Sequence, residues 1–358
     1  MRQLVLDNRA EVIARDFESA MMKPYPKSVS LFNKAEKALT DLKKKLNSYN
    51  TLKVNSGTAK SPVWTVLKKT DIIAYIELIL QYHQELLTVH PSGKNGFSFY
   101  ISKYEGVISP DYINKGLVAD GSSLDSLANQ IVKAMKYKEM RDDIYPSVTR
   151  DLGIKTCVYC NANYTISDRN GNGYYDLDHW KPKAKYPYLC TSFFNLQPAC
   201  PSCNRKKSDD VKKEFFQLWD DTGKQDLDVL SVNLTPESVT EYLLDHDASK
   251  LDPYLYARKP QYDQMCKDTN KKLHINARYK EHVDVAEEVI WKARAYNASY
   301  SKAMRDAFVE DAKTLGLNLS NDELNRFILG TYANPEDIHK RPLTAFIQSI
   351  GRQLGLIK

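Results

Sequence analysis

The chain has 358 residues, 42% hydrophobic content and a formal net charge of +6. Its length suits two or three domains, and its mild positive charge is compatible with an anionic partner without identifying one. The best apolar run, Ile72–Leu80, is interrupted by Glu77 and is too short to span a bilayer. The N-terminus lacks the apolar core of a signal peptide, and six cysteines are too few for a disulfide framework. We therefore expect a cytoplasmic protein.

Residues 1–145 predict a mainly helical N-terminal region. Ala35–Leu46 is amphipathic and rich in lysine, which indicates either a solvated face or a surface for nucleic acid. Apolar residues recur at helical spacing over Ile72–Leu87 and predict a second helix. Phe97–Ile101 is a candidate short strand, and a further helix is expected from Ser122 or Ser123 to about Met140.

Two C-x-x-C pairs dominate the centre of the chain, which we delimit as residues 146–220. Cys157 and Cys160 form the first pair, Cys200 and Cys203 form the second, and 39 residues separate them. Four thiolates arranged as two pairs suit tetrahedral Zn²⁺ in a structural site without an open position. Because the gap is longer than in ordinary zinc ribbons, a module with its own secondary structure is expected between the pairs.

The residues between and after the pairs predict the order strand, strand, helix. Gly173–His179 alternates polar and apolar residues after a polar turn, and Pro182 lies just beyond its end. Phe193–Pro198 is the second candidate strand. Cys200–Lys207 follows as a helix, with Pro201 near its start.

In this order the motifs resemble the HNH (His-Me finger, ββα-metal) nucleases in their zinc-knuckled form. The resemblance rests on the two cysteine pairs, Asp178-His179, Asn195 and the sequence Cys203-Asn204-x-x-Lys207, and it covers roughly residues 150–215. Many members carry histidine where this chain has Asn204. The resemblance implies that Asn195 holds the loop that orients His179 and that Lys207 contacts phosphate.

The chemistry of these residues agrees with that resemblance. A histidine with an ordinary pKa of about 6.5 can accept a proton from water, which makes His179 the predicted general base. Asp178 and Asn204 offer oxygen atoms, the donors preferred by Mg²⁺ or Mn²⁺. Alternation along the strand places Asp176 on the same face as Asp178, so Asp176 remains an alternative ligand. The loop Lys181–Tyr188 interleaves cations with aromatic residues and indicates either a nucleic-acid surface or a solvated loop.

Residues 221–358 predict a second helical region. Ser231–Leu234 is a candidate strand, Ile275–Tyr300 a strongly amphipathic helix, and Pro342–Leu356 a terminal helix. The expected fold class is therefore α+β, a mostly helical chain around a zinc-stapled ββα module. Whether the two flanks form one domain or two stays open.

The predicted function is metal-dependent cleavage of nucleic acid, DNA rather than RNA. The layout of a zinc-knuckled centre with helical flanks is similar to bacterial defence nucleases, including the HNH partner of Septu-type anti-phage systems, which works with a separate ATPase. No G-x-x-x-x-G-K-[S/T] motif is present, so nucleotide-driven control would come from a partner. The alternatives are a scaffold that binds nucleic acid or protein without cutting and a nuclease directed at RNA.

Overall fold

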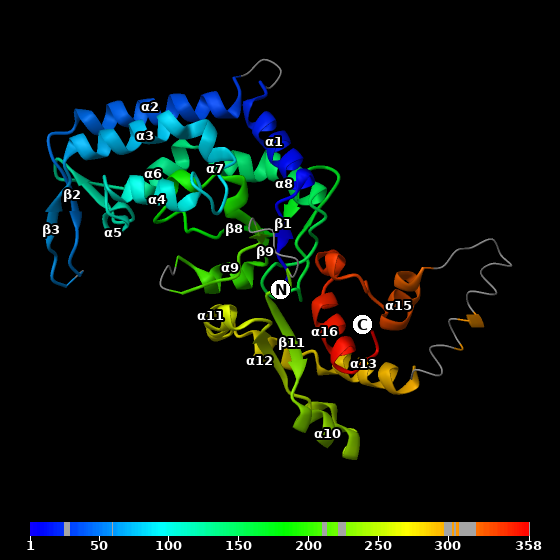
Figure 1. Cartoon of the computed structure of the whole chain (residues 1–358). Helices are drawn as coiled ribbons and strands as arrows, with labels where there is room; N and C mark the ends of the chain where they lie inside the picture. Colours follow the sequence, from blue (N-terminus) through cyan, green and yellow to red (C-terminus); the bar gives the residue numbers. More distant parts are fainter. Residues whose placement is uncertain are drawn as a thin grey trace.

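The computed structural model describes residues 1–24, 29–58, 60–209, 213–220, 227–296, 303, 306–307 and 320–357. Its elements confirm the predicted class, a mostly helical α+β fold with small sheets. Figure 1 shows the N-terminal region in blue and cyan, the central module in green, and the C-terminal region in yellow-green to red. The central module lies between the two flanks.

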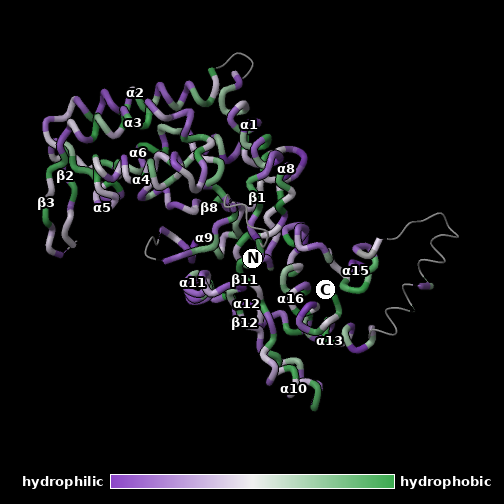
Figure 2. Tube along the Cα trace, viewed as in Figure 1, coloured by the Kyte–Doolittle hydropathy of each residue, from purple (hydrophilic) through white to green (hydrophobic). Residues whose placement is uncertain are grey.

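Two long helices form the outer layer of the N-terminal region (Figure 1). They run antiparallel, since Lys43 of α2 pairs with Glu77 of α3 and Lys69 Nζ donates to the carbonyl of Asn47. Their facing residues, among them Leu39 and Ile76, are fully buried, and Figure 2 shows the polar and apolar alternation along α2 that an amphipathic helix requires. The elements are β1 (Leu4–Val5), α1 (Asn8–Met22), α2 (Leu31–Ser48), β2 (Leu52–Asn55), β3 (Trp64–Val66), α3 (Lys69–Leu87), α4 (Phe97–Glu105), α5 (Pro110–Ile113), β4 (Leu117–Ala119), β5 (Ser122–Leu124), α6 (Leu127–Ala134), α7 (Tyr137–Glu139) and the π-helix η1 (Met140–Ile144).

Two predictions for this region are wrong. Phe97–Ile101 belongs to helix α4, because Phe97, Tyr100 and Tyr104 share one buried face at helical spacing. Ser122 and Ser123 lie in strand β5, and α6 begins only after Ser126, whose hydroxyl caps it by accepting from the Asn129 N–H.

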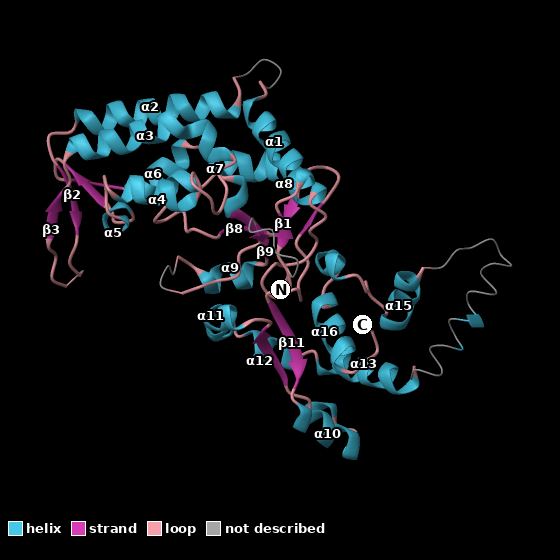
Figure 3. Ribbon diagram, viewed as in Figure 1, coloured by secondary structure: helices cyan, strands magenta, loops and turns pink. Residues whose placement is uncertain are grey.

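The central module contains the predicted strand, strand and helix. Strands β8 and β9 pair antiparallel with Asp178 opposite Gln197 and His179 opposite Leu196, and α9 follows directly (Figure 3). The predicted strand from Gly173 is divided at Tyr175, because its first part pairs with β6 instead. The elements are α8 (Tyr145–Asp151), β6 (Ile166–Ser167), β7 (Gly173–Tyr174), β8 (Asp176–His179), the 3₁₀ turns η2 (Pro187–Leu189) and η3 (Phe193–Asn195), β9 (Leu196–Ala199), α9 (Pro201–Lys207) and β10 (Trp219–Asp220).

The C-terminal region combines an antiparallel strand pair with helices. The predicted strand is confirmed as β11 and the predicted terminal helix as α16. The predicted helix Ile275–Tyr300 is divided at His282, and residues 297–300 lie outside the described part of the chain. The elements are β11 (Leu230–Leu234), α10 (Pro236–Asp245), η4 (Ala248–Lys250), β12 (Pro253–Ala257), η5 (Pro260–Tyr262), α11 (Asp263–Leu273), α12 (Ile275–Lys280), α13 (Val283–Ala295), α15 (Asn321–Leu329), η6 (Pro335–Lys340) and α16 (Thr344–Gln353).

The start of the chain joins the three parts. Strand β1 pairs in parallel with β10 at the end of the central module, and the Arg2 carbonyl accepts from Nε2 of His339 in the C-terminal region. Among the described helices, none combines the length and the apolar character needed to cross a bilayer.

Candidate functional site

The four predicted zinc ligands meet at one point. The sulfur atoms of Cys157, Cys160, Cys200 and Cys203 all lie within 4.8 Å of one another, and all four residues are buried. The first pair lies in a turn before β6. In the second pair, Cys200 is the N-cap of α9 and Cys203 lies in its first turn. Four sulfurs within one tetrahedral coordination sphere fit a structural Zn²⁺.

Hydrogen-bond donors surround this cluster and support the same interpretation. Nη1 of Arg278 donates to the Cys203 sulfur at 2.8 Å, while its Nη2 donates to the Ser202 hydroxyl at 2.7 Å. The Asn163 side-chain amide lies 3.7 Å from the sulfurs of both Cys160 and Cys200. Donors directed at several sulfurs are the partners expected around metal-bound thiolates, and a guanidinium offsets part of their negative charge.

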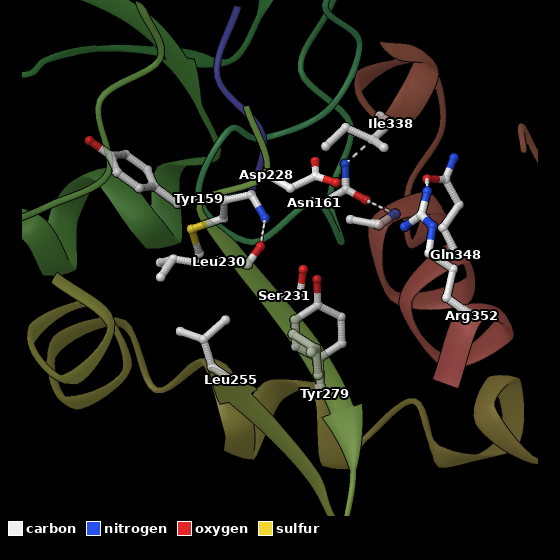
Figure 4. Close-up of a pocket in the computed structure, with 13 residues that line it drawn as sticks. Tyr159, Asn161, Asp228, Leu230, Ser231, Leu255, Tyr279, Ile338, Gln348 and Arg352 are labelled. Carbon is white, nitrogen blue, oxygen red and sulfur yellow. Dashed lines mark hydrogen bonds between the residues drawn. The ribbon is translucent and has the colours of Figure 1, made fainter. Parts of the chain in front are cut away.

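A small cavity lined by both polar and apolar residues lies behind the first cysteine pair (Figure 4). The side-chain amide of Asn161 crosses it and donates to the Ile338 carbonyl at 2.8 Å, while its oxygen accepts from the Ala345 N–H at 2.9 Å. Tyr279 also reaches this knuckle, donating to the Cys160 carbonyl at 2.6 Å. With a volume of about 20 Å³, the cavity has room for roughly one water and excludes a substrate. Its residues attach the C-terminal region to the knuckle.

His179, the predicted base, is the last residue of β8 and is buried. Its Nε2 lies 3.0 Å from the Cys190 carbonyl oxygen. Because a carbonyl can only accept, Nε2 carries the proton and Nδ1 is left as a proton acceptor. The Tyr137 ring lies 4.8 Å from the imidazole. Burial lowers the pKa of His179 well below its ordinary value, and the charge of Lys183 lowers it further, so the imidazole is neutral at neutral pH.

Asp178 and Lys207 form a buried ion pair, with side chains 5% and 2% exposed. The Lys207 ammonium lies 3.1 Å and 3.2 Å from the two carboxylate oxygens and donates to the His179 carbonyl at 2.8 Å. Tyr159, between the first two cysteines, donates its hydroxyl to Asp178 at 2.5 Å. Burial raises the pKa of Asp178, and Lys207 opposes that effect. In this arrangement the ammonium predicted to contact phosphate is enclosed by protein.

Asn204 contacts the other carboxylate of β8. Its amide donates to Asp176 Oδ2 at 3.0 Å, and both side chains are half-buried. The sequence paired Asn204 with Asp178, whereas the structure brings it onto the alternative ligand Asp176. Oxygen atoms of a carboxylate and an amide at a partly open position fit a divalent cation.

Asn195 fixes the loop that follows His179. Its side-chain oxygen accepts from the Lys181 N–H at 2.7 Å, and its amide donates to the carbonyls of Lys181 and Leu189 at 3.1 and 3.0 Å. This side chain therefore ties both ends of the loop together, next to the Cys190 carbonyl that orients His179.

Two further residues, Tyr137 and Lys183, lie beside the His179 imidazole. Tyr137 contacts the His179 ring and donates its hydroxyl to the Leu177 carbonyl at 3.1 Å, and the Lys183 ammonium lies 4.2 Å from the centre of the Tyr137 ring. Burial lowers the pKa of Lys183, while the nearby carboxylates of Asp178 and Asp176 act to raise it. No sequence pattern pointed to Tyr137, and Lys183 was indicated only as one cation of the mixed loop.

The comparison with known families identifies the class of this module. Residues 157–210 match the family described as HNH endonuclease. Together with the four-cysteine cluster, this match makes the central module an HNH endonuclease domain, as its motifs predicted.

A particular relative shares part of the chain. Over 59 residues, 16% of this chain, the sequence is 39% identical to the Septu protein PtuB of Bacillus thuringiensis. The chain spans 21% of the length of that curated relative. No solved structure matches this chain.

Proposed function

We propose that this chain is an endonuclease that hydrolyses phosphodiester bonds of nucleic acid, DNA in preference to RNA. The observation that carries the proposal is the His179 imidazole within the HNH segment. Its Nε2 proton is held by the Cys190 carbonyl at 3.0 Å, which leaves Nδ1 to take a proton from an attacking water. Burial lowers the pKa of His179, so this nitrogen is unprotonated at neutral pH.

The remaining residues supply charge and position. Asn204 and Asp176 would hold a divalent cation such as Mg²⁺ or Mn²⁺. Asp178 would be a further ligand, because its carboxylate can accept more than the hydrogen bonds from Tyr159 and Lys207. Such a cation, when bound, supplies Lewis-acid stabilisation of the charge that develops on the phosphate. Lys183, beside His179, adds a positive charge from the protein itself. Zn²⁺ on the four cysteines is structural.

Cleavage of supercoiled plasmid with and without magnesium tests this function. The wild type is expected to nick the plasmid only with the cation. His179→Ala is expected to lose cleavage while keeping its fold, zinc content and DNA binding. Equal cleavage by wild type and variant would rule out His179 as the base. Parallel digests of RNA test the preference for DNA.

The same assay identifies the metal ligand. Asp176→Asn should cost more activity than Asp178→Asn at low magnesium if Asp176 is the ligand, and added cation should restore part of it. The reverse order would assign the cation to Asp178, as the sequence predicted.

The buried ion pair of Asp178 and Lys207 favours a second candidate function. Asp178 accepts from the Lys207 ammonium and the Tyr159 hydroxyl, as a carboxylate with a purely structural role would. The second candidate is therefore an HNH scaffold that binds nucleic acid or a partner without cutting. Absence of cleavage with magnesium, manganese and other divalent ions, together with intact DNA binding, would favour it.

We also propose a role in bacterial anti-phage defence together with a partner ATPase, in the cytoplasm. The similarity to a Septu protein supports this proposal, and the lack of a P-loop in the chain means that ATP hydrolysis would belong to another protein. Purification of the tagged chain from its host, followed by an ATPase assay, tests it. A preparation that contains no ATPase would contradict the partnership.

A further inference from the structure

A cleft lies beside the loop that follows His179. It has a volume of about 310 Å³, near the lower end for sites that hold a small organic ligand. Trp180, Lys181 and Tyr186 come from that loop, Phe215 from the segment after α9, and Met265 from α11. The central module and the C-terminal region thus both contribute walls.

Two aromatic rings of this cleft are half-exposed and held in place. The Trp180 indole donates to the Phe215 carbonyl at 3.3 Å, and the Tyr186 backbone N–H closes a turn onto the Pro182 carbonyl at 2.9 Å. Phe215 is buried and contributes an apolar wall. Fixed aromatic faces next to an opening of this size are suited to stacking with a planar ring.

The cleft carries charges of both signs, because Lys181 and Lys213 line it together with the exposed carboxylate of Glu214. The Lys181 ammonium lies 4.2 Å from the centre of the Trp180 ring and has no carboxylate within salt-bridge distance among the described residues. Lys213, a second lining cation, lies 3.4 Å from Asp268 and is therefore partly neutralised. The side formed by Trp180 and Lys181 matches a ligand with both a planar ring and a negative charge, as in a nucleotide.

This cleft is rigidly connected to the proposed base. Trp180 follows His179 directly, and Asn195 fixes both the N–H and the carbonyl of Lys181. In a duplex both faces of each base are already stacked, so only an unpaired nucleotide can present a face here.

We propose that the cleft of Trp180, Lys181, Tyr186 and Phe215 binds one unstacked nucleotide of the substrate, which makes single-stranded or locally unpaired nucleic acid the preferred substrate. This inference rests on the proposed nuclease function for the position of the scissile phosphate. The binding itself has a readout that does not require cleavage, namely the fluorescence of Trp180.

The experiment uses the full chain carrying His179→Ala, Trp64→Phe and Trp291→Phe. The two replaced tryptophans are 52% and 60% exposed, and the remaining Trp219 is 2% exposed, so Trp180 is the accessible reporter. A 12-nucleotide single-stranded DNA is expected to quench its emission, and a 12-base-pair duplex is expected to have little effect. Adding Trp180→Phe should abolish the quenching without abolishing binding. Equal quenching by single strand and duplex, or binding of the single strand without quenching, overturns the proposal.

Affinities measured by fluorescence anisotropy test the other walls. Tyr186→Ala should weaken binding of the single strand about 5- to 100-fold, the effect of losing one stacked base. Tyr254→Ala, which removes a half-exposed tyrosine outside the cleft, should not. Lys181→Gln should lower the slope of log Kd against log salt concentration by about 0.7, the value for one phosphate contact on a single strand. Unchanged values for both cleft variants would refute the site. If single-stranded DNA quenches Trp180 but the wild-type protein cleaves no nucleic acid, only the proposed nuclease function is refuted.

Discussion

Replacement of Lys207 by methionine separates two roles for this lysine. The resemblance to HNH nucleases implies a phosphate contact, which would affect substrate binding and leave stability unchanged. The structure instead shows a side chain 2% exposed that pairs with a carboxylate 5% exposed. Methionine nearly preserves the volume of the stem but leaves the Asp178 carboxylate buried with only Tyr159 as a side-chain donor.

The size of the effect follows from the burial. Removal of one partner of a buried ion pair costs about 3–5 kcal/mol, because the other charge stays desolvated. An unfolding entropy of about 2.1 cal/mol/K per residue implies that 1 kcal/mol shifts the melting temperature of a 358-residue chain by roughly 1.3 °C. We therefore expect Lys207→Met to melt about 4–7 °C below the wild type, for a chain that unfolds as one unit.

Thermal unfolding followed by circular dichroism measures this shift, with Lys206→Met as the matched control. Lys206 is the exposed neighbour on the same helix and should melt within about 1 °C of the wild type. Adding Asp178→Asn to Lys207→Met removes the uncompensated charge and should recover much of the loss. If Lys207→Met melts like the control and loses only DNA affinity, the lysine is a phosphate contact and the reasoning from burial is refuted.

Three further predictions concern zinc and pH. Cys200→Ser should lower the zinc content from about one ion per chain and reduce the melting temperature, because metal binding contributes to folding; an unchanged zinc content would remove this residue from the site. Arg278→Met should speed zinc transfer to a chelator and weaken zinc affinity about 10- to 100-fold, whereas exposed Arg294→Met should not; equal transfer from both variants would contradict a role for the guanidinium. Burial lowers the pKa of His83 from 6.5 to about 4. Between these two pH values His83 is protonated in the unfolded chain and neutral in the folded chain. Stability should therefore fall as the pH falls from 6.5 to 4, by about 2 kcal/mol at pH 5, and urea titrations of His83→Leu should lack that part of the loss; an identical pH dependence in wild type and variant would contradict it.

The zinc cluster was predictable because its signal is local. Each C-x-x-C pair brings two sulfurs together whatever the surrounding fold, and the polar turn, alternating strand and proline near Cys200 give the order strand, strand, helix. The outer donors were not predictable in this way. Arg278 is 75 residues from Cys203, and no sequence pattern joins a residue of α12 to a knuckle of the central module.

The partners of the site residues depend on how the elements pack, so they could not be predicted from the sequence. Alternation placed Asp176 and Asp178 on one face of β8, but only the position of α9 decides that Asn204 contacts the first and Lys207 the second. Short apolar runs were similarly ambiguous. Phe97–Ile101 reads as a strand by composition, and it becomes a helix because three aromatic rings at helical spacing pack inward.

The contacts of α12 with the cysteine knuckles affect how this protein is made. Arg278 and Tyr279 reach Cys203 and the Cys160 carbonyl, and the latter contact joins residues 119 positions apart. During synthesis all four cysteines leave the ribosome well before these two residues do. A nascent chain therefore forms these contacts to its metal centre only after most of the protein has emerged. Residues 150–215 transplanted into another scaffold would lack the contacts of Arg278 and Tyr279.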